Sequence, residues 1–590
     1  MSKTTSPDAG SAKLSSGGFI RKSIRPVVFI LALCMVLSLL PPVTASSYTP
    51  AVSTLRIGLF HGSSALASAN LQNVDGMGRG YEFGYYNSSR SFVPLDVTTN
   101  ETRITMMMDR NMYWDPGGAS SGEYREGTSG SVVVGCFHIQ PDQGYSSFAE
   151  AKVVADRYTD GFVRYQAGRY IPLVGQFATR DSAVAAISSR GFSGATVNSG
   201  TSNTITVTRT GTNTILFEYE NGTTPFGVRP LPIANEKPET WFRGYRYNGG
   251  FRYERRSGTL LTVVNMVATE DYVKGILPYE MSNTWPLEAL KTQACCARTY
   301  AMTTLNRHSA DGFDLCVEIH CQVYRGRNQS NARTDQAVDE TAGMYVTYNG
   351  QPAETYYSAA NGGASESVVN VWGTARPYLI GVIDPYEADI ISMYRSYYWS
   401  VSFTQAQLTQ RLRDRGYDFA TIASVRVSQR TPTGNVLSVV ITDVNGKSQT
   451  FTRQSQLRTA LGVATQNFSI VGSGESQIPG GIYVNSPAQQ LPPGAQYIAI
   501  DGTGAAAAVP GGTMFAIDGS GNVTSVDSSG GGTSSDGTGF VNGVITINGA
   551  GNGHLVGMSQ WGAYSMARFH DKTFDEIIKF YFPGVDITQT

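Results

Sequence analysis

A single carboxylate stands out in the stretch GILPYEMSNTWPLEALKTQACCARTYAM, residues 275–302. Glu280 precedes a helix that we expect over residues 286–307, and it comes about five residues too early for the first turn of that helix. We therefore expect Glu280 on a loop. Apolar neighbours would keep its carboxyl protonated near neutral pH, as a general acid requires. The alternative is an ordinary exposed glutamate. The apolar neighbours are Pro278, Tyr279, Met281 and Trp285.

Two histidines and two cysteines lie close together in the short stretch RHSADGFDLCVEIHCQ. Imidazole and thiolate are ligands that zinc prefers, and two of each complete a closed tetrahedral site. Such a site leaves no open position for water, so its zinc would be structural. The alternative is a Cys316–Cys321 disulfide in an oxidising compartment. The predicted ligands are His308, Cys316, His320 and Cys321.

Two further blocks carry hydroxyl, amide and imidazole groups suited to sugars, YYSAANGGASESVVNVWG and GNGHLVGMSQWGAYSMA. The glycine pair of the first block permits close backbone approach to a ligand. Two more polar residues lie on the helix after Glu280. The alternative role of Arg298 is a structural ion pair, and the alternative role of Ser559 is to cap a helix. The polar residues concerned are Gln293 and Arg298 on the helix, and Tyr357, Ser358, His554, Ser559 and Gln560 in the two blocks.

Taken in this order, the Glu280 stretch, the block from HCQVYRG to NVWG and the GNGHLVGMSQ block resemble the stage II sporulation protein D (SpoIID)/LytB family. The resemblance covers roughly residues 230–470 and 540–590. It implies that Glu280 is the catalytic glutamate of a Pro-x-Glu-Met pattern and that the helix after it lines the substrate cleft. The seven polar residues above are therefore the predicted substrate-binding residues. Some members of the family bind zinc through a similar His/Cys cluster. Leu555 replaces a glycine of the family's usual loop, which puts the shape of that loop in question.

The family includes lytic transglycosylases of peptidoglycan and relatives described as amidase enhancers. A lytic transglycosylase needs one carboxylate, because the nucleophile is the C6 hydroxyl of the substrate's own muramic acid. A hydrolase needs two carboxylates, and the candidates for a second are Glu288, Glu354 and Glu366. We expect an exported enzyme that leaves anhydro-muramic acid ends, with sporulation and engulfment as its candidate setting. The alternative is a non-catalytic wall-binding amidase enhancer.

The elements that position these residues predict an α+β fold, a mixed catalytic domain with one long helix and antiparallel strands. Ahead of it, VVVGCF and IPLVGQF are each followed by an Ala-rich helix. This pair of units resembles a SPOR-like module, whose family binds glycan strands stripped of peptides; a generic ferredoxin-like unit is the alternative. The expected parts are a signal peptide (1–45), a β-rich region (46–130), the SPOR-like module (131–209), the catalytic domain (210–471), a Gly/Ser-rich insert (472–540) and its C-terminal part (541–590).

The N-terminus and the composition indicate the compartment and the partners. Basic residues precede an apolar run over 27–40 and the small-residue site Val43-Thr44-Ala45, as in a secretory signal, although an uncleaved anchor remains an alternative. We expect export to the cell wall or the outer face of the cytoplasmic membrane. The net charge of -1 provides no basic field for nucleic acid. The expected partners are peptidoglycan glycan strands and, under the enhancer alternative, an amidase.

Overall fold

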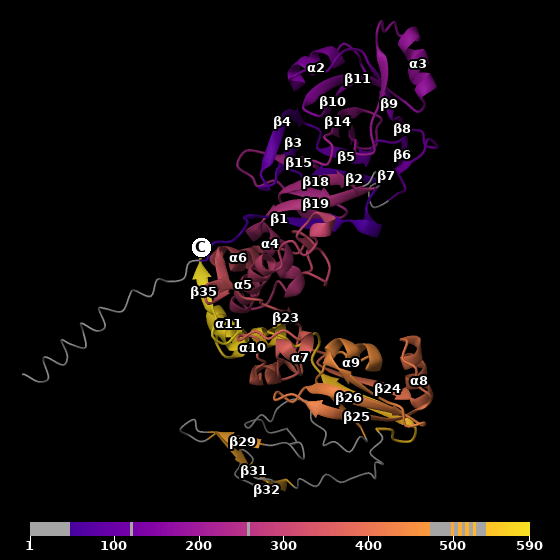
Figure 1. The fold of residues 1–590 in the computed structure, drawn as a ribbon. Helices are drawn as coiled ribbons and strands as arrows, with labels where there is room; N and C mark the ends of the chain where they lie inside the picture. Colours follow the sequence, from indigo (N-terminus) through magenta and orange to yellow (C-terminus); the bar gives the residue numbers. More distant parts are fainter. Residues whose placement is uncertain are drawn as a thin grey trace, which may run out of the picture. The chain divides into compact units, whose positions relative to one another are not determined.

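The computed structural model describes residues 48–118, 122–256, 260–471, 497–500, 506–509, 514–517, 523–526 and 539–590. The expected signal peptide and most of the expected insert lie outside the described residues. Helices and strands alternate without a repeating βα order, so the predicted α+β class is confirmed (Figure 1). Within these residues, no helix is both long and apolar enough to cross a membrane.

Two large sheets form the first half of the described chain. The seven-stranded sheet has the order β20-β1-β19-β18-β15-β3-β4, and the ten-stranded sheet has the order β12-β9-β11-β10-β14-β13-β5-β2-β16-β17. β1 (Thr54–Phe60) pairs antiparallel with β19 (Leu261–Ala268), a strand from a distant part of the sequence. Because β13 and β14 also join strands from distant segments, the sheets cross the boundaries expected at 131 and 209.

The remaining strands of these sheets have the following bounds: β2 (Ser68–Asn73), β3 (Gly78–Tyr86), β4 (Phe92–Thr99), β5 (Arg103–Met108), β9 (Phe137–Gln140), β10 (Gly161–Gln166), β11 (Arg169–Phe177), β12 (Thr196–Ser199), β13 (Ile205–Arg209), β14 (Ile215–Glu220), β15 (Phe226–Pro232), β16 (Thr240–Phe242), β17 (Tyr245–Tyr247), β18 (Gly250–Arg255) and β20 (Leu315–Cys316). A small separate sheet contains β6 (Met112–Asp115), β7 (Glu123–Glu126) and β8 (Val133–Val134).

Two strand–helix units are present, but the first is shifted from the prediction: its strand begins at Phe137, the last residue of VVVGCF, while Val133–Val134 form β8 of the small separate sheet. β9 leads to α2 (Phe148–Ala155) and β11 leads to α3 (Arg180–Ser189), and the side chains of Ser147 and Thr179 cap the two helices. The strand order β12-β9-β11-β10 in a βαββαβ chain is a ferredoxin-like arrangement. β10 continues the sheet by pairing with β14, so this unit is not a separate body. Its SPOR-like identity stays a prediction.

Three helices follow: α4 (Thr269–Glu280), α5 (Leu287–Thr303) and α6 (Ala332–Glu340). α5 begins one residue after the predicted start and ends four residues before the predicted end. The apolar period of this helix predicts a buried stripe, and Leu290, Ala294, Ala297 and Ala301 are fully buried, while Leu287 at its start is half-buried. Around α5 lie β21 (Met344–Tyr348), β22 (Gln351–Pro352), β23 (Tyr357–Ser358), α7 (Val368–Trp372), β34 (Met558–Ser559), α10 (Gln560–Phe569), α11 (Phe574–Tyr581) and β35 (Asp586–Gln589).

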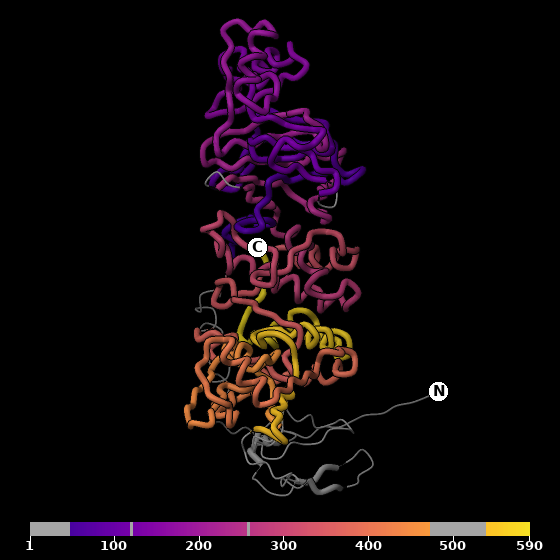
Figure 2. The backbone as a smooth tube through the Cα atoms, turned by 90° about the vertical axis from the view of Figure 1, so that its right-hand side faces the viewer, coloured from indigo at the N-terminus to yellow at the C-terminus, as the bar shows by residue number. Residues whose placement is uncertain are grey.

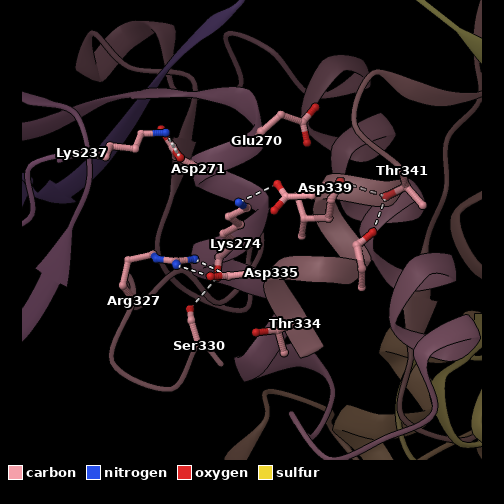
Figure 3. Close-up of polar contacts among 12 residues, drawn as sticks. Lys237, Glu270, Asp271, Lys274, Arg327, Ser330, Thr334, Asp335, Asp339 and Thr341 are labelled. Atoms are coloured by element: carbon pink, nitrogen blue, oxygen red, sulfur yellow. Dashed lines mark hydrogen bonds and ion pairs between the residues drawn. The ribbon is translucent and has the colours of Figure 1, made fainter. Parts of the chain in front are cut away.

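Ion pairs fix α4, the helix that ends at Glu280. Lys274 on α4 pairs with Asp339 on α6 at 2.6 Å, and Asp271 at the start of α4 pairs with Lys237 (Figure 3). Pro278 lacks the N–H that would bond the carbonyl of Lys274, and the hydroxyl of Ser330 donates to that carbonyl at 3.1 Å instead. The helix therefore continues through its proline to Glu280.

A further unit begins at β24 (Tyr398–Thr404). It also contains α8 (Gln405–Asp414), β25 (Ile422–Arg430), β26 (Val436–Asp443), β27 (Ser448–Thr452), α9 (Arg453–Leu461), β28 (Phe468–Ile470) and β33 (Val544–Ala550). A hairpin turn at Asn445-Gly446, a dipeptide typical of such turns, joins β26 to β27. β33, which follows the expected insert, pairs with both β24 and β28. The segment after the insert therefore lies beside the strands that precede the insert (Figure 2).

Two short hairpins are described within the expected insert: β29 (Tyr497–Ile500) with β30 (Ala506–Val509), and β31 (Met514–Ile517) with β32 (Val523–Val526).

Candidate active site

Glu280 is the last residue of α4, so the prediction that it lies on a loop is wrong. The helix ends there because Met281 takes an extended conformation, with φ -128° and ψ 148°. Of the four residues expected to form an apolar wall, Pro278 and Met281 are buried, whereas Tyr279 and Trp285 are half-buried, as is Glu280 itself. A helix end holds the carboxyl more rigidly than a loop would.

Two donors hold the carboxylate of Glu280. The backbone N–H of Val323 donates to Oε1 at 3.0 Å, and Gln560 Nε2 lies 3.4 Å from Oε2. Gln560 also donates to Gln293 Oε1 at 3.2 Å, so the structure brings three of the predicted site residues together. Burial raises the pKa of Glu280, while the bonds from Val323 and Gln560 lower it by less. A raised pKa suits a group that must carry a proton at neutral pH.

The segment after Cys321 forms a strap beside this carboxylate, and its Gln322 was missed by sequence reasoning. Gln322 Nε2 donates to the hydroxyl of Tyr357 at 2.8 Å, and the hydroxyl of Tyr272 donates to Gln322 Oε1 at 3.1 Å. Burial and the nearby Glu280 raise the pKa of Tyr357, so its hydroxyl stays neutral. Gln322 belongs to HCQVYRG, a segment of the block that resembles the family, but no feature of the sequence indicates that its amide has a role in the site.

A pair of buried carboxylates, also missed, fixes the Asn361-Gly362-Gly363 loop. Glu387 accepts the backbone N–H groups of Asn361, Gly362 and Gly363 at 2.6, 2.7 and 3.1 Å. Burial and the neighbouring Asp384 raise the pKa of Glu387 to about 7. These two acids are well separated from the loop in the sequence, and they carry no motif of their own.

Ser559 also bonds the carboxylate of Glu387. Its fully buried hydroxyl donates to Glu387 and accepts the N–H of Gly562 at 3.0 Å, which caps α10. The cap was the alternative role considered for this residue. Ser358 lies beside it, because β23 and β34 pair at Ser358 and Ser559. Direct sugar contacts by these two hydroxyls stay a prediction.

Arg298 does not reach Glu280. Its fully buried guanidinium bonds Glu270 at 2.9 and 2.6 Å and the carbonyl of Met344 at 3.2 Å. This is the structural ion pair considered as its alternative role, and it joins α4 to α5 and β21. The structure therefore gives Arg298 a supporting position within the site rather than one beside the carboxylate.

The loop before β34 keeps a glycine-like conformation at Leu555. Its φ is +64°, a region that strains residues other than glycine, and its side chain is buried. His554 beside it faces Trp372, with ring centroids 5.2 Å apart. Burial lowers the pKa of His554 to about 4, so the imidazole is neutral. The loop shape that the leucine put in question is thus retained under strain.

The three other candidate acids are engaged away from Glu280. Glu288 pairs with Lys291 and accepts the N–H of Phe574. Glu354 pairs with Arg376 at 2.6 Å. Glu366 is buried and accepts bonds from Ser367, Asn370, Thr431, Thr433 and Asn435. None of the three shares a hydrogen bond with Glu280 among the residues that the structure describes.

Comparison with known proteins gives the family. Residues 257–348 match the model of the SpoIID family, described as stage II sporulation protein. An uncharacterized protein of Brachyspira hyodysenteriae is 32% identical over 345 residues, which cover 58% of this chain and 73% of that protein. The chain belongs to the SpoIID family. The matched residues contain Glu280, the four predicted metal ligands and Arg298.

Two named relatives of this SpoIID chain come from Bacillus subtilis. Its stage II sporulation protein D is 24% identical over 341 residues, 55% of this chain and 76% of that protein. Its amidase enhancer is 28% identical over 330 residues, 54% of this chain. The match spans only 40% of the amidase enhancer's own length.

The predicted zinc ligands of the SpoIID chain converge. One donor atom from each of His308, Cys316, His320 and Cys321 lies within 4.8 Å of the others. Cys321 Sγ is 3.4 Å from His308 Nε2 and 3.7 Å from His320 Nδ1, and Cys316 Sγ is 3.8 Å from the same Nδ1. All five cysteines in the described residues are free thiols. The four donor atoms are thus close enough to share one metal ion, and the zinc itself stays a prediction.

A second group of metal-binding residue types, missed by sequence reasoning, lies in the ten-stranded sheet. Asp109, His138 and Glu218 are buried with donor atoms within 4.8 Å of one another. Arg164 donates to Glu218 at 2.8 and 2.6 Å and lies 3.9 Å from Asp109. Because a guanidinium already neutralises the carboxylates, this group is a buried ion network rather than a cation site.

Proposed function

We propose that this SpoIID chain is a peptidoglycan lytic transglycosylase with Glu280 as its acid and base. The observation that carries the proposal is the environment of that carboxyl: burial raises its pKa, and two amide donors fix both oxygens. A carboxyl that stays protonated can deliver a proton to a glycosidic oxygen.

The reaction needs no second carboxylate. Glu280 gives its proton to the oxygen that bridges two sugars, and the bond from that oxygen to C1 of muramic acid breaks. The C6 hydroxyl of the same muramic acid attacks C1 and gives its proton to the Glu280 carboxylate, which restores the acid and closes the anhydro ring. Because the nucleophile is already part of the substrate, no water has to be activated. The engagement of Glu288, Glu354 and Glu366 elsewhere supports this route over hydrolysis.

Holding the carboxyl in place is the task of its neighbours. The N–H of Val323 fixes one oxygen, and Gln560, itself bonded to Gln293, fixes the other. Both donors also stabilise the carboxylate that forms after proton transfer. Tyr357, held by Gln322, lies beside the same group and offers a hydroxyl to the substrate.

We also propose a structural zinc at His308, Cys316, His320 and Cys321. In a tetrahedron with zinc–sulfur bonds near 2.3 Å and zinc–nitrogen bonds near 2.0 Å, neighbouring donor atoms lie roughly 3.3–3.8 Å apart. The distances of 3.4, 3.7 and 3.8 Å fit that requirement. Four protein ligands close the site, so the metal would order the segment between α5 and the strap and take no part in the chemistry.

The remaining assignments concern setting. We also propose export to the cell wall, which the signal-like N-terminus supports, and a role in sporulation, which the name of the stage II sporulation protein D relative supports. The βαββαβ unit would bind glycan as a SPOR-like module. Because β10 bonds to β14, a fragment that tests this should include β13 and β14.

The deciding experiment is mass spectrometry of the products from purified peptidoglycan. Anhydro-muramic acid ends, absent from a Glu280→Gln reaction, are the expected result. Mainly reducing ends would mean hydrolysis and a second acid. The name of the B. subtilis amidase enhancer favours one other candidate function, stimulation of an amidase. Uncut glycan would favour that function if an added amidase also cleaved the peptide linkage faster in the presence of this chain than in its absence.

A further inference from the structure

Four aromatic side chains cluster together, and two of them belong to segments that also supply Glu280 and its donor Gln560. Trp285 follows Glu280 by five residues, and Trp561 directly follows Gln560, whose amide contacts Glu280. The ring centroids of the two tryptophans are 4.8 Å apart. Tyr564 lies 5.0 Å from Trp285, and the ring of Tyr394 stacks on Trp561 at 5.2 Å. We call Trp285, Tyr394, Trp561 and Tyr564 the aromatic platform.

The platform lies at the border of the hydrophobic core. All four rings are half-buried, and they pack against the margins of two core clusters without entering either. Apolar surface continues from Tyr564 to Phe569, which is 47% exposed, and Met393 beside Tyr394 is 45% exposed. Apolar side chains that are exposed together, rather than singly, are a feature of binding surfaces.

Polar groups border the platform. Asn552 Nδ2 donates to the hydroxyl of Tyr394 at 3.0 Å, and Asn552 is exposed. Ser282 and Thr284, just before Trp285, are hydroxyl residues at its edge. A pyranose ring has the matching pattern, with an apolar C–H face and hydroxyl groups around its edge. Aromatic rings with a few placed polar groups are the usual lining of small-molecule sites.

We propose that the aromatic platform binds a pyranose ring of the glycan strand next to the bond that Glu280 cleaves. This inference rests on the proposed function and adds a substrate subsite to it. Binding energy from a sugar that does not react holds the scissile bond against the acid, which Glu280 and its two amide donors cannot do alone. The three segments that supply the rings, at 285, 394 and 561–564, fix the subsite only in the folded chain.

The test separates binding from cleavage. The background is the full chain carrying Glu280→Gln, which keeps the shape of the site. Trp285→Leu and Trp561→Leu are introduced into it one at a time. We measure the affinity of each variant for peptide-free glycan strands and for a β-1,4-linked N-acetylglucosamine hexamer. Each change should weaken binding about two- to tenfold. Trp561→Phe keeps a ring and should recover most of the affinity. Trp241→Leu is the matched control, since Trp241 is a half-buried tryptophan on β16 of the ten-stranded sheet.

Each outcome is decisive. Because the βαββαβ unit would also hold glycan, the KM for glycan cleavage, which reports only glycan bound at Glu280, is measured for the same changes in the chain that keeps Glu280. Equal affinity and equal KM in Trp285→Leu, Trp561→Leu and the control would overturn the platform, even if the unaltered chain makes anhydro ends. Weaker binding in the leucine variants without any anhydro ends from the unaltered chain would leave the platform standing and remove the transglycosylase assignment. Unchanged glycan affinity with loss of binding to an amidase would make this a protein-docking surface and overturn the proposal.

Discussion

The backbone N–H of Val323 donates to Glu280 Oε1 at 3.0 Å, across 43 residues of sequence. Val323 comes two residues after Cys321, one of the four converging metal-binding residues. The strap that reaches the carboxyl therefore begins at the proposed zinc site. Gly275 allows this strap to pass close to α4, because a Cβ there would lie 2.4 Å from the ring of Tyr324. The metal-binding residues and the proposed acid thus belong to one local structure.

Replacement of the acid is the first prediction. Glu280→Gln should reduce glycan cleavage by about 10²-fold or more, because the proton donor is lost, and it should leave the circular dichroism spectrum unchanged. Product ends are counted by mass spectrometry. Glu288→Gln is the control, since this acid begins α5 and pairs with Lys291. Full activity in the Glu280 variant would remove Glu280 from the chemistry.

The raised pKa of Glu280 predicts a pH-dependent difference in stability. The folded chain holds the proton more tightly than the unfolded chain, so the cost of burying the charge is absent below the unfolded pKa of about 4.3. That cost develops as pH rises through the folded pKa. Glu280→Gln removes it, and the Tm of the variant relative to the wild type should therefore increase from pH 4 to pH 8. A difference that is constant with pH would contradict the raised pKa.

The third prediction concerns the metal. The purified chain should contain about one zinc, and Cys316→Ser should lower both zinc content and Tm because one of four ligands is lost. Glycan cleavage should fall as well, since the strap places the N–H of Val323 on Glu280. Cys136→Ser, at a free half-buried thiol elsewhere, should keep the zinc. Zinc-free protein with a mapped Cys316–Cys321 disulfide would exclude this site.

Arg298 gives a prediction of stability. Arg298→Met removes the guanidinium that pairs with the one-third exposed Glu270 and that bonds the carbonyl of Met344, so it should destabilise the chain by about 2 kcal/mol. Arg190→Met, which breaks the more exposed pair with Asp160, should cost about 1 kcal/mol or less. Denaturant unfolding followed by circular dichroism measures both. Equal losses in the two variants would mean that the buried pair has no special weight.

Several features follow from the sequence because their signals are local. The metal-binding residues all belong to the one short stretch from His308 to Cys321, and their side chains can meet without distant help. The Asn445-Gly446 turn and the strand–helix units depend on turn chemistry, caps and hydrophobic period, which neighbouring residues set. The importance of Glu280 also came from its immediate surroundings and from the resemblance that those residues carry.

Only the tertiary structure decided what surrounds the carboxyl. Gln560 lies 280 residues from Glu280 in the sequence. Glu387 lies 172 residues from Ser559, whose hydroxyl donates a hydrogen bond to it. The N–H of Val323 has no sequence signature, because every residue except proline carries the same group. Glu280 lies at the end of a helix and not on a loop, because the hydroxyl of Ser330 bonds the carbonyl of Lys274, which Pro278 has no N–H to bond. Local patterns identify which groups can react, while long-range packing decides which donors reach them.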